Sequence, residues 1–412
     1  MHSPPELPSR AAGPDAPLHG IRVVDMSTVL MGPVATQILG DYGADIVKVD
    51  PPEGDVGRYA GTARHGGMGS LHLATGRNKR SIVLDIKHPE GREVLLSLCR
   101  GADVFIHNVR PEAMRRARLD ADQLLAVNPR LVYVSLVGFG QDGPYAGRPA
   151  FDDIIQGASG IADLFARTNG GQPQFIPWNV ADRITGVTAA HATLAALLMR
   201  ARTGAGQAIE VPMYETVVQM VLGDHMAGMT YQPRAGEPGY QRLLAKGRRP
   251  YRTADGHLVA TPYTDRQFDA LFRAVGRPDE MASNPMLRNA QVRGQNWPAI
   301  YVLLGEIFLT RSTADWLQVC GEGEIPCTPV RALEDLPGDP HLQAVGLFQK
   351  TQHPSEGAIL QMRPTSRFSA ADVSIRRPAP RIGEHSIEVL REIGLSGEAI
   401  ERLLADGVTR AG

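Results

Sequence analysis

A single carboxylate stands at the head of a long apolar segment of the chain. Asp182 precedes a run dense in Ala and Leu, and this run predicts a helix that ends near Arg202. An acid at that point can accept hydrogen bonds from free backbone N–H groups and complement the helix dipole. The same carboxylate can also attack an acyl group as a nucleophile. This segment alone leaves both roles open.

Basic side chains gather near the ends of two other predicted elements. NKRS at 78–81 places Lys79 and Arg80 directly before a strand, and RPEAMRRAR at 110–118 places four arginines on a strand-to-helix connection. Asn108 closes a neighbouring strand. Ligands of open α/β sheets bind at strand ends, and arginines suit phosphate groups. Both clusters are therefore either a polyphosphate site or a solvated surface.

Several common site motifs are missing from the sequence. No G-x-G-x-x-G follows the first predicted strand, and neither a P-loop nor a G-x-S-x-G elbow occurs. These gaps disfavour a nicotinamide dehydrogenase and an α/β-hydrolase. The histidines lack ligand spacing, so we expect no metal. We expect HGGMGS at 65–70 to be a loop.

The composition is that of a globular protein without a strong charge bias. The chain has 412 residues, a net charge of -1, 43% hydrophobic and 21% charged residues, which suggests two or three domains. No apolar run approaches the length of a membrane span, so we expect no membrane partner. A net charge of -1 does not favour nucleic acid, so we expect no nucleic-acid partner either. The three cysteines predict reduced thiols, and residues 1–17 predict a flexible tail without a signal peptide. We therefore expect a cytoplasmic protein.

The first half of the chain alternates apolar strands with helical segments. Such strands indicate a parallel sheet that is covered on both faces. The expected strands are 21–26, 44–50, 81–86, 104–108 and 131–139, and the expected helices are 33–43, 88–101 and about 111–126. The fold class is therefore α/β.

The pattern changes near residue 225 and changes back near 340. We expect a smaller α+β domain over about 225–335, with a turn at DG 255–256. Two short amphipathic helices near the end of the chain could pack on the first domain or on another subunit.

A series of motifs closely resembles the family III CoA-transferases, a group that includes α-methylacyl-CoA racemases. They include VVDMSTVLMGPVATQILGDYGADIVKVDPP, GRNKRSIVLDIKHPEG, DVFIHNVRPEAM, VADRITG, RTGAGQAIEVPM and PRIGEHS. The resemblance extends roughly from residue 19 to residue 410.

The resemblance implies a fold, a cofactor and a partner. It implies a Rossmann-like large domain built from 18–224 and 336–412, an inserted small domain over 225–335, and an interlinked homodimer. Coenzyme A would bind along the large domain as part of an acyl-CoA substrate. The implied CoA contacts are Asn108 and Val109 beside the pantetheine, Lys79 and Arg116 nearer the nucleotide, and Val29, Leu30 and Met31.

Asp182 falls on the nucleophilic aspartate of this family. The resemblance implies a mixed anhydride, then an aspartyl-CoA thioester, and then transfer to an acceptor carboxylate. The nucleophile must be ionised, and we expect the helix dipole to lower its pKa. Capping and catalysis are then compatible.

Two departures from the family pattern narrow the chemistry. Racemases carry a His where Phe151 stands, and a phenyl ring cannot take a proton, although Asp152 or Asp153 could substitute. Formyl-CoA:oxalate transferases carry a Gln where Leu30 stands, and their glycine-rich flap has no counterpart in 236–264.

These departures favour a succinyl-CoA-type donor and a small dicarboxylic or substituted acid as acceptor. Arg64 and His65 are candidates for reading a remote carboxylate, or they belong to a plain surface loop. The alternatives are a racemase, an intramolecular CoA-transferase and a CoA-binding protein that has lost catalysis.

Overall fold

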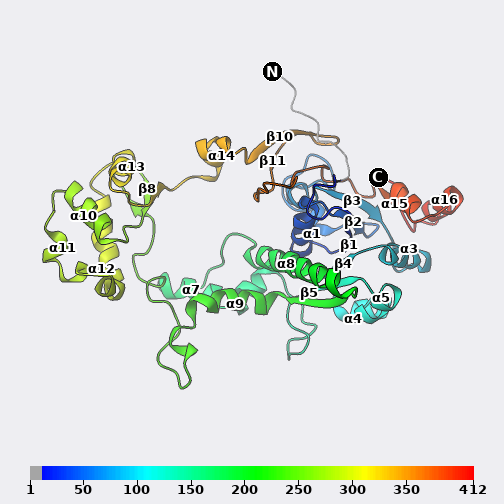
Figure 1. Ribbon diagram of the computed structural model, residues 1–412, viewed down its shortest axis with the longest axis horizontal. Helices are drawn as coiled ribbons and strands as arrows, with labels where there is room; N and C mark the ends of the chain where they lie inside the picture. Colours follow the sequence, from blue (N-terminus) through cyan, green and yellow to red (C-terminus); the bar gives the residue numbers. More distant parts are fainter. Residues whose placement is uncertain (1–11) are drawn as a thin grey trace. The chain divides into compact units, whose positions relative to one another are not determined.

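The larger unit of the protein is built on a six-stranded parallel sheet. The structure is a computed structural model that describes residues 12–412. The strand order is β3-β2-β1-β4-β5-β6 (Figure 1). The strands are β1 (Arg22–Met26), β2 (Asp45–Asp50), β3 (Lys79–Val83), β4 (Val104–His107), β5 (Val132–Val137) and β6 (Gln207–Pro212). The predicted α/β class with a parallel sheet is confirmed, and this order reverses between β1 and β4.

Helices cover both faces of the sheet, which explains why strands such as β4 (VFIH) and β5 (VYVSLV) are largely apolar and buried. On one face, α3 (Pro89–Arg100), α5 (Ala121–Val127), α15 (Ser386–Glu392) and α16 (Gly397–Ala405) form a core with the sheet. That core includes Val47, Ile82, Phe105, Leu95 and Leu403. On the other face, α1 (Met31–Asp41) packs against α8 (Val180–Thr203) and against β1 and β2.

The close approach of α1 and α8 depends on one glycine. A Cβ atom at Gly186 would lie 2.6 Å from the carbonyl oxygen of Met31 and 2.9 Å from the side chain of Val34. Gly186 is one helical turn after Asp182. The position of Asp182 therefore depends on this contact.

One sequence expectation about a helix is wrong. The helix expected near 111–126 is broken into α4 (Pro111–Ala117) and α5, because Arg118 adopts a left-handed φ of 53°. Asp120 then caps α5 by accepting from the N–H of Gln123. HGGMGS is a loop over residues 65–69, as expected, and its last residue begins α2 (Ser70–Thr75) with Gly69 as the N-cap.

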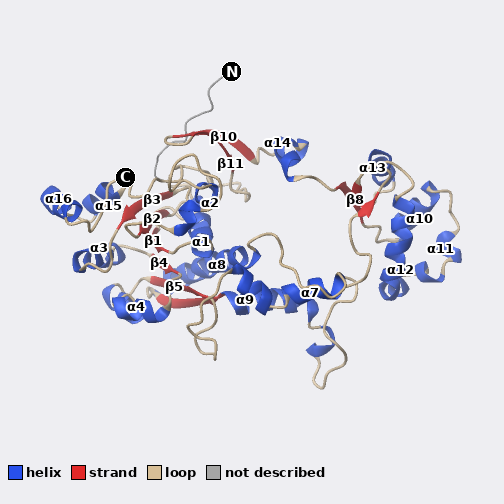
Figure 2. Cartoon of the chain, turned by 180° about the vertical axis from the view of Figure 1, so that it is seen from behind, coloured by secondary structure: helices blue, strands red, loops and turns tan. Residues whose placement is uncertain are grey.

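The end of the chain returns to the outer edge of β3. The N–H of Ser81 donates to His385 Nδ1, and the N–H of Val83 donates to Ser386 Oγ at 3.2 Å. This unit also contains η1 (Val56–Tyr59), α6 (Asp152–Ala158), α14 (Pro340–Ala344) and the hairpin of β10 (Phe348–His353) and β11 (Gly357–Met362), with strands in red in Figure 2. The larger unit therefore uses both ends of the described chain.

Residues of the predicted N-terminal tail fall into two groups. Residues 1–11 lie outside the described residues. Residues 12–17 form a turn in which Ala16 is buried, and the N–H of Leu18 donates to the carbonyl oxygen of Tyr42.

Helix α8 meets the length and composition of a membrane span, contrary to the expectation that no run would. Its mean hydropathy is 1.3 over the best window, and 44% of that window is buried inside the protein. A core helix passes the same test.

The smaller unit comprises Ile161–Gln174 and Val221–Asp339. Its three-stranded sheet pairs β7 (Tyr251–Arg252), β8 (His257–Ala260) and β9 (Cys327–Pro329) in antiparallel fashion. A core that includes Phe268, Phe308 and Trp316 joins this sheet to its helices. The helical elements are α7 (Ile161–Thr168), the end of α9 (Met213–His225), η2 (Ala227–Thr230), α10 (Asp265–Ala274), α11 (Glu280–Ser283), η3 (Pro285–Leu287), α12 (Ala290–Phe308), α13 (Thr313–Glu322) and η4 (Leu333–Gly338). The boundaries at 225 and 335 stay predictions.

Candidate active site

Asp182 lies in the first turn of α8 but does not cap it. The N-cap residue is Asn179, whose side chain makes no capping hydrogen bond. The backbone N–H of Asp182 instead donates to Asp152 Oδ2 at 3.0 Å. The capping role considered for Asp182 is therefore filled by a different acid, from α6.

Asp152 is held firmly in this position. It is only 6% exposed, and its second oxygen accepts from Gln156 Nε2 at 2.6 Å. The Gln156 side-chain oxygen in turn accepts from the backbone N–H of Ile176 at 2.9 Å. Three segments of the chain thus fix one carboxylate against the start of α8.

The surroundings of Asp182 shift its pKa upward. Burial and, second to it, the negative charge of Asp152 raise the pKa of Asp182 to about 7, against the opposing charge of Arg183. The expectation that the helix dipole would lower this pKa is wrong, because desolvation and a like charge outweigh the dipole. Asp182 therefore exchanges its proton near neutral pH.

A cavity of about 290 Å³ opens beside Asp182 in the larger unit. Its walls come from the segments that follow β1, β4 and β5, the carboxyl ends of the central strands. Among the described residues that line it, Asp182 is the carboxylate and Arg110 and Arg148 are the cations. A cavity with this lining suits an anionic ligand with an electrophilic carbon near Asp182.

Five of the predicted site residues meet at this cavity. They are Asp182, Asn108, Val109, Val29 and Met31. They come from four strand or helix ends, and the α/β fold brings those ends together.

The loop after β1 is locked in an unusual backbone conformation. Val29 has a φ of 65°, a value that is rare for a β-branched residue. Its N–H donates to Asp55 at 2.9 Å, and the Asn108 amide both accepts from the N–H of Thr28 and donates to the carbonyl oxygen of Thr28 at 2.9 Å. Side chains from two other segments therefore hold the cavity wall in place.

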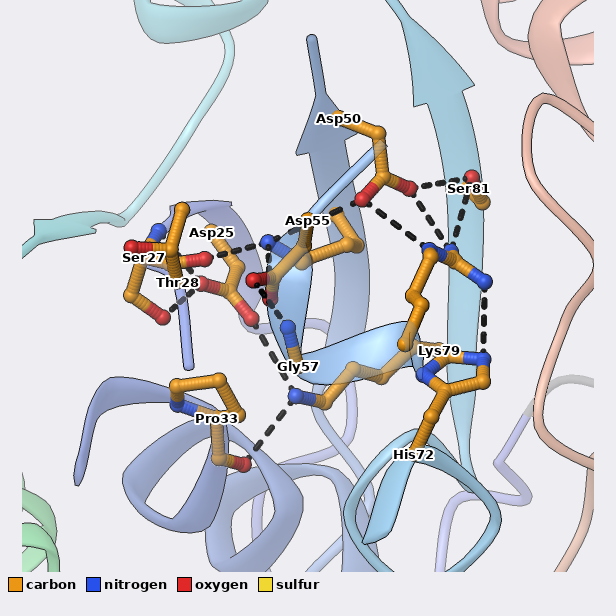
Figure 3. Close-up of polar contacts among 12 residues, drawn as sticks. Asp25, Ser27, Thr28, Pro33, Asp50, Asp55, Gly57, His72, Lys79 and Ser81 are labelled. Carbon is orange, nitrogen blue, oxygen red and sulfur yellow. Dashed lines mark hydrogen bonds and ion pairs between the residues drawn. The ribbon is translucent and has the colours of Figure 1, made fainter. Parts of the chain in front are cut away.

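Lys79 does not line the Asp182 cavity, and its burial speaks against the predicted contact with CoA. Its Nζ donates to the carbonyl oxygen of Pro33 and pairs with Asp25 Oδ2 at 3.2 Å (Figure 3). It also donates to Thr36 Oγ1 at 2.7 Å. The residue is only 2% exposed. Lys79 is the first residue of β3, and its ammonium donates hydrogen bonds to Pro33 and Thr36 of α1.

The buried charges around Lys79 belong to a larger network. Asp50 pairs with Arg58 at 2.7 Å, and Lys48 lies 3.6 Å from Asp55. Figure 3 shows Asp50 and Asp55 near Lys79. Three carboxylates, Asp25, Asp50 and Asp55, face three cations, Lys48, Arg58 and Lys79. Asp55 also holds Val29, so this network supports the wall of the cavity.

Leu30 and Arg116 do not line the cavity either. The Leu30 side chain is 1% exposed and belongs to the core. The Arg116 side chain is 72% exposed on α4 and pairs with Glu112 at 3.0 Å. Leu30 is therefore a packing residue of the core and not the CoA contact that was predicted. Arg116 lies on the surface outside the cavity.

Arg64 and His65 pair with a turn of the β10–β11 hairpin. His65 Nδ1 lies 3.1 Å from Glu356 Oε1, and the Arg64 guanidinium donates to the carbonyl oxygen of Glu356. Neither residue lines the Asp182 cavity, so the structure does not support the idea that Arg64 and His65 bind the remote carboxylate of an acceptor acid.

Two features of the site were missed from the sequence. Arg148 lines the cavity and lies 4.2 Å from the Tyr145 ring centroid, but an isolated arginine in a loop gives no signal. Asp152 was considered only as a substitute base. The DD pair at 152–153 did not reveal which carboxylate would face α8.

Phe151 lines the cavity and is 67% exposed. The structure thus places a phenyl ring at the position where racemases carry their histidine. Within residues 12–412, no group of three or more His, Cys, Asp or Glu side chains could hold a metal ion. The expectation of no metal stays a prediction.

Comparison with known proteins identifies the class. The family model described as CoA-transferase family III matches residues 18–386. A succinate–glutarate CoA-transferase of Agrobacterium fabrum is 33% identical over 397 residues, which cover 94% of this chain and 97% of that protein. The beta subunit of a succinyl-CoA–L-malate CoA-transferase of Chloroflexus aurantiacus is 34% identical, with 94% and 96% covered.

A solved structure agrees with these relatives. A CAIB/BAIF family protein from Brucella suis has a TM-score of 0.79 and 32% identity, and the match covers 92% of this chain and 100% of that one. The fold, the site and the relatives define a CoA-transferase. The chain belongs to CoA-transferase family III.

Proposed function

We propose that this enzyme transfers CoA from succinyl-CoA to a small dicarboxylic or substituted carboxylic acid, with Asp182 as the nucleophile. The observation that carries the proposal is the Asp182 carboxylate on the wall of a cavity that also presents Arg110 and Arg148. The curated relatives, whose names include succinate, glutarate and malate, support this choice of substrates.

The reaction balances without a redox step or an added proton. An Asp182 oxygen attacks the thioester carbonyl and the C–S bond breaks. CoA leaves as a thiolate, and Asp182 and the acyl group form a mixed anhydride. The thiolate then attacks the Asp182 carbonyl, and the anhydride C–O bond breaks to release the donor acid. An acceptor carboxylate reverses both steps and restores Asp182.

The cavity suits this sequence of charges. The Arg110 and Arg148 guanidinium groups are placed to stabilise the carboxylates and the thiolate that form in turn. Asn108, Val109, Val29 and Met31 would contact the pantetheine arm, with Arg116 nearer the nucleotide. Arg116→Ala should then raise the KM for acyl-CoA and leave kcat unchanged, and a fall in kcat alone would argue against this placement.

A covalent trap tests the nucleophile. The protein is incubated with succinyl-CoA, quenched in hydroxylamine or borohydride, and mapped by peptide mass spectrometry. We expect the modification on the peptide that holds Asp182, and none in Asp182→Ala. Asp153→Asn is the matched control, because Asp153 is an exposed acid beside Asp152. If Asp182→Ala keeps more than a few per cent of turnover, the mechanism is wrong.

The geometry gives less support to the racemase. Phe151 cannot accept a proton, and both oxygens of Asp152 already accept hydrogen bonds. Deuterium incorporation at the α-carbon of a 2-methylacyl-CoA, without labelling of Asp182, would reverse this choice. An intramolecular CoA-transferase would use the same chemistry but would need no separate acceptor acid. A requirement for an added acceptor acid therefore distinguishes the two reactions.

We also propose that the enzyme is a cytoplasmic homodimer. Helix α8 carries exposed apolar side chains, with Val187 at 53% and Leu198 at 66%. A second copy of the chain would cover this face and remove it from water. Cell fractionation tests the location.

A further inference from the structure

The smaller unit contains a separate cavity of about 290 Å³ with a cluster of arginines. Arg242, Arg248 and Arg249 line it together with Tyr251, Trp297 and Tyr301. It shares no lining residue with the cavity of Asp182. All of its walls belong to the smaller unit, so its composition can be considered on its own.

Aromatic rings hold one of these arginines in place. The Arg242 guanidinium carbon lies 4.9 Å from the Trp297 ring centroid and 5.4 Å from that of Tyr263. Trp297 is itself stacked on Tyr301 at 5.3 Å. Stacking on aromatic faces reduces the freedom that a guanidinium loses on binding. Arg242 is therefore oriented before any ligand arrives.

The positive charge of this cavity is not neutralised by its own walls. Its lining residues, all within the described chain, include no Asp or Glu. Arg248 and Arg249 are exposed, and neither makes an ion pair among the described residues.

Several other arginines of the same unit have an acidic partner. Arg266 pairs with Glu324 at 3.0 Å, Arg277 with Glu280 at 2.8 Å, and Arg331 with Asp339 at 2.9 Å. Arginines without such partners, gathered around one hollow, leave an excess of positive charge there.

We propose that this cavity binds a small organic anion with two or more carboxylate or phosphate groups. A guanidinium offers a planar fork of N–H donors that fits either group. Tyr251, Val259 and Leu304 supply an apolar floor for a short hydrocarbon link between the charges. The site goes beyond the proposed transfer reaction, because none of its residues takes part in the chemistry at Asp182.

Isothermal titration calorimetry on the full-length protein tests this site, with glutarate in one arm and inorganic phosphate in the other. We expect saturable binding of at least one anion, weakened about tenfold or more in the double variant Arg248→Ala/Arg249→Ala. Arg252→Ala is the matched control, because it removes an exposed arginine from β7 that does not line the cavity. Binding of glutarate alone identifies a carboxylate site, and binding of phosphate alone identifies a phosphate site, in each case only for the binding that the double variant weakens.

Three results would overturn the proposal. They are no binding of either anion, equal binding by the double variant and the parent, or equal loss in Arg252→Ala. Arg242→Met provides a second test, because it keeps an unbranched side chain against Trp297 and removes the charge. Succinyl-CoA labelling of Asp182 is measured in parallel on each variant. A labelling failure in the parent counts against the proposed function and leaves the anion site to be judged by calorimetry.

Discussion

At the scale of single residues, the charge of Asp182 is controlled by its neighbours. Burial and the carboxylate of Asp152 raise the pKa of Asp182 to about 7, while Asp152 also binds the backbone N–H of the same residue. One acid therefore both positions the start of α8 and holds the Asp182 carboxyl, the proposed nucleophile, near its point of ionisation. A carboxylate of higher pKa is also a stronger nucleophile once ionised.

We predict that transferase activity depends on the ionisation of Asp182. Since only the carboxylate form attacks, kcat/KM should rise with pH through about 7 and level off above it. Asp152→Asn removes the negative charge that raises this pKa, so the midpoint should move to lower pH. The measurement is the pH profile of kcat/KM for succinyl-CoA in both proteins. An unchanged midpoint would show that Asp152 does not act on Asp182 through its charge.

The same pKa predicts a gain in stability when the charge is removed. The folded pKa lies above the unfolded value of 3.8, so ionisation of Asp182 opposes folding as pH rises from about 4, and the full cost is reached above about 7. Asp182→Asn should therefore stabilise the protein by about 1–2 kcal/mol at pH 8, after allowance for solvent screening. The gain should be smaller at pH 5. Urea unfolding at both pH values measures it, and a gain that is equal or larger at pH 5 contradicts the assignment.

At the scale of elements, the crossing of α1 and α8 positions the site. The backbone of Met31 lies against Gly186, while Met31 also lines the cavity that Asp182 faces. The two helices thus set the distance between the loop after β1 and Asp182.

We predict that Gly186→Ala impairs catalysis through this crossing. The new methyl group would meet the carbonyl oxygen of Met31 at 2.6 Å, so the helices must separate, at a cost of about 1–3 kcal/mol. We expect a lower kcat and a lower melting temperature. Gly157→Ala on α6 is the matched control, since a Cβ there meets no atom within 4 Å. Equal effects of the two substitutions would show that the helix crossing is not responsible.

The strands were predictable from the sequence because strands covered on both faces are rich in apolar, β-branched residues. The ends of elements were less predictable. Lys79 was expected before a strand, but β3 begins at Lys79 itself, and this register buries the ammonium beside Asp25. The break at Arg118 depends on a left-handed backbone angle that residue type alone does not reveal.

The site was predictable only in part, and the reason is physical. Asp182, Asn108 and the loop at 29–31 were found through motifs of adjacent residues. The pairing of Asp152 with Asp182 joins positions 30 residues apart and depends on how α6 meets α8. The upward pKa shift follows from this tertiary contact and from burial, so the local sequence suggested the opposite sign.

At the scale of the whole molecule, we predict a stable dimer. The chain mass is 44.5 kDa, and light scattering after size exclusion should give twice that value. Leu198→Glu places a charge on the exposed apolar face of α8 and should weaken the dimer, because a buried unpaired charge is costly. Glu93→Gln changes an exposed residue of α3 and is the control. A monomer in the parent protein at micromolar concentration would contradict the prediction.

The return of the chain end to β3 has a consequence for synthesis in the cell. The first strands of the sheet leave the ribosome long before His385 and Ser386 are made. The side chains of these two residues accept hydrogen bonds from the backbone N–H groups of Ser81 and Val83 in β3. During that interval β3 presents an unpaired edge, which invites pairing with another chain. The larger unit can therefore complete its folding only after His385 and Ser386 have been made. A premature stop codon shortly before residue 383 would remove the cover of a sheet edge rather than a dispensable tail.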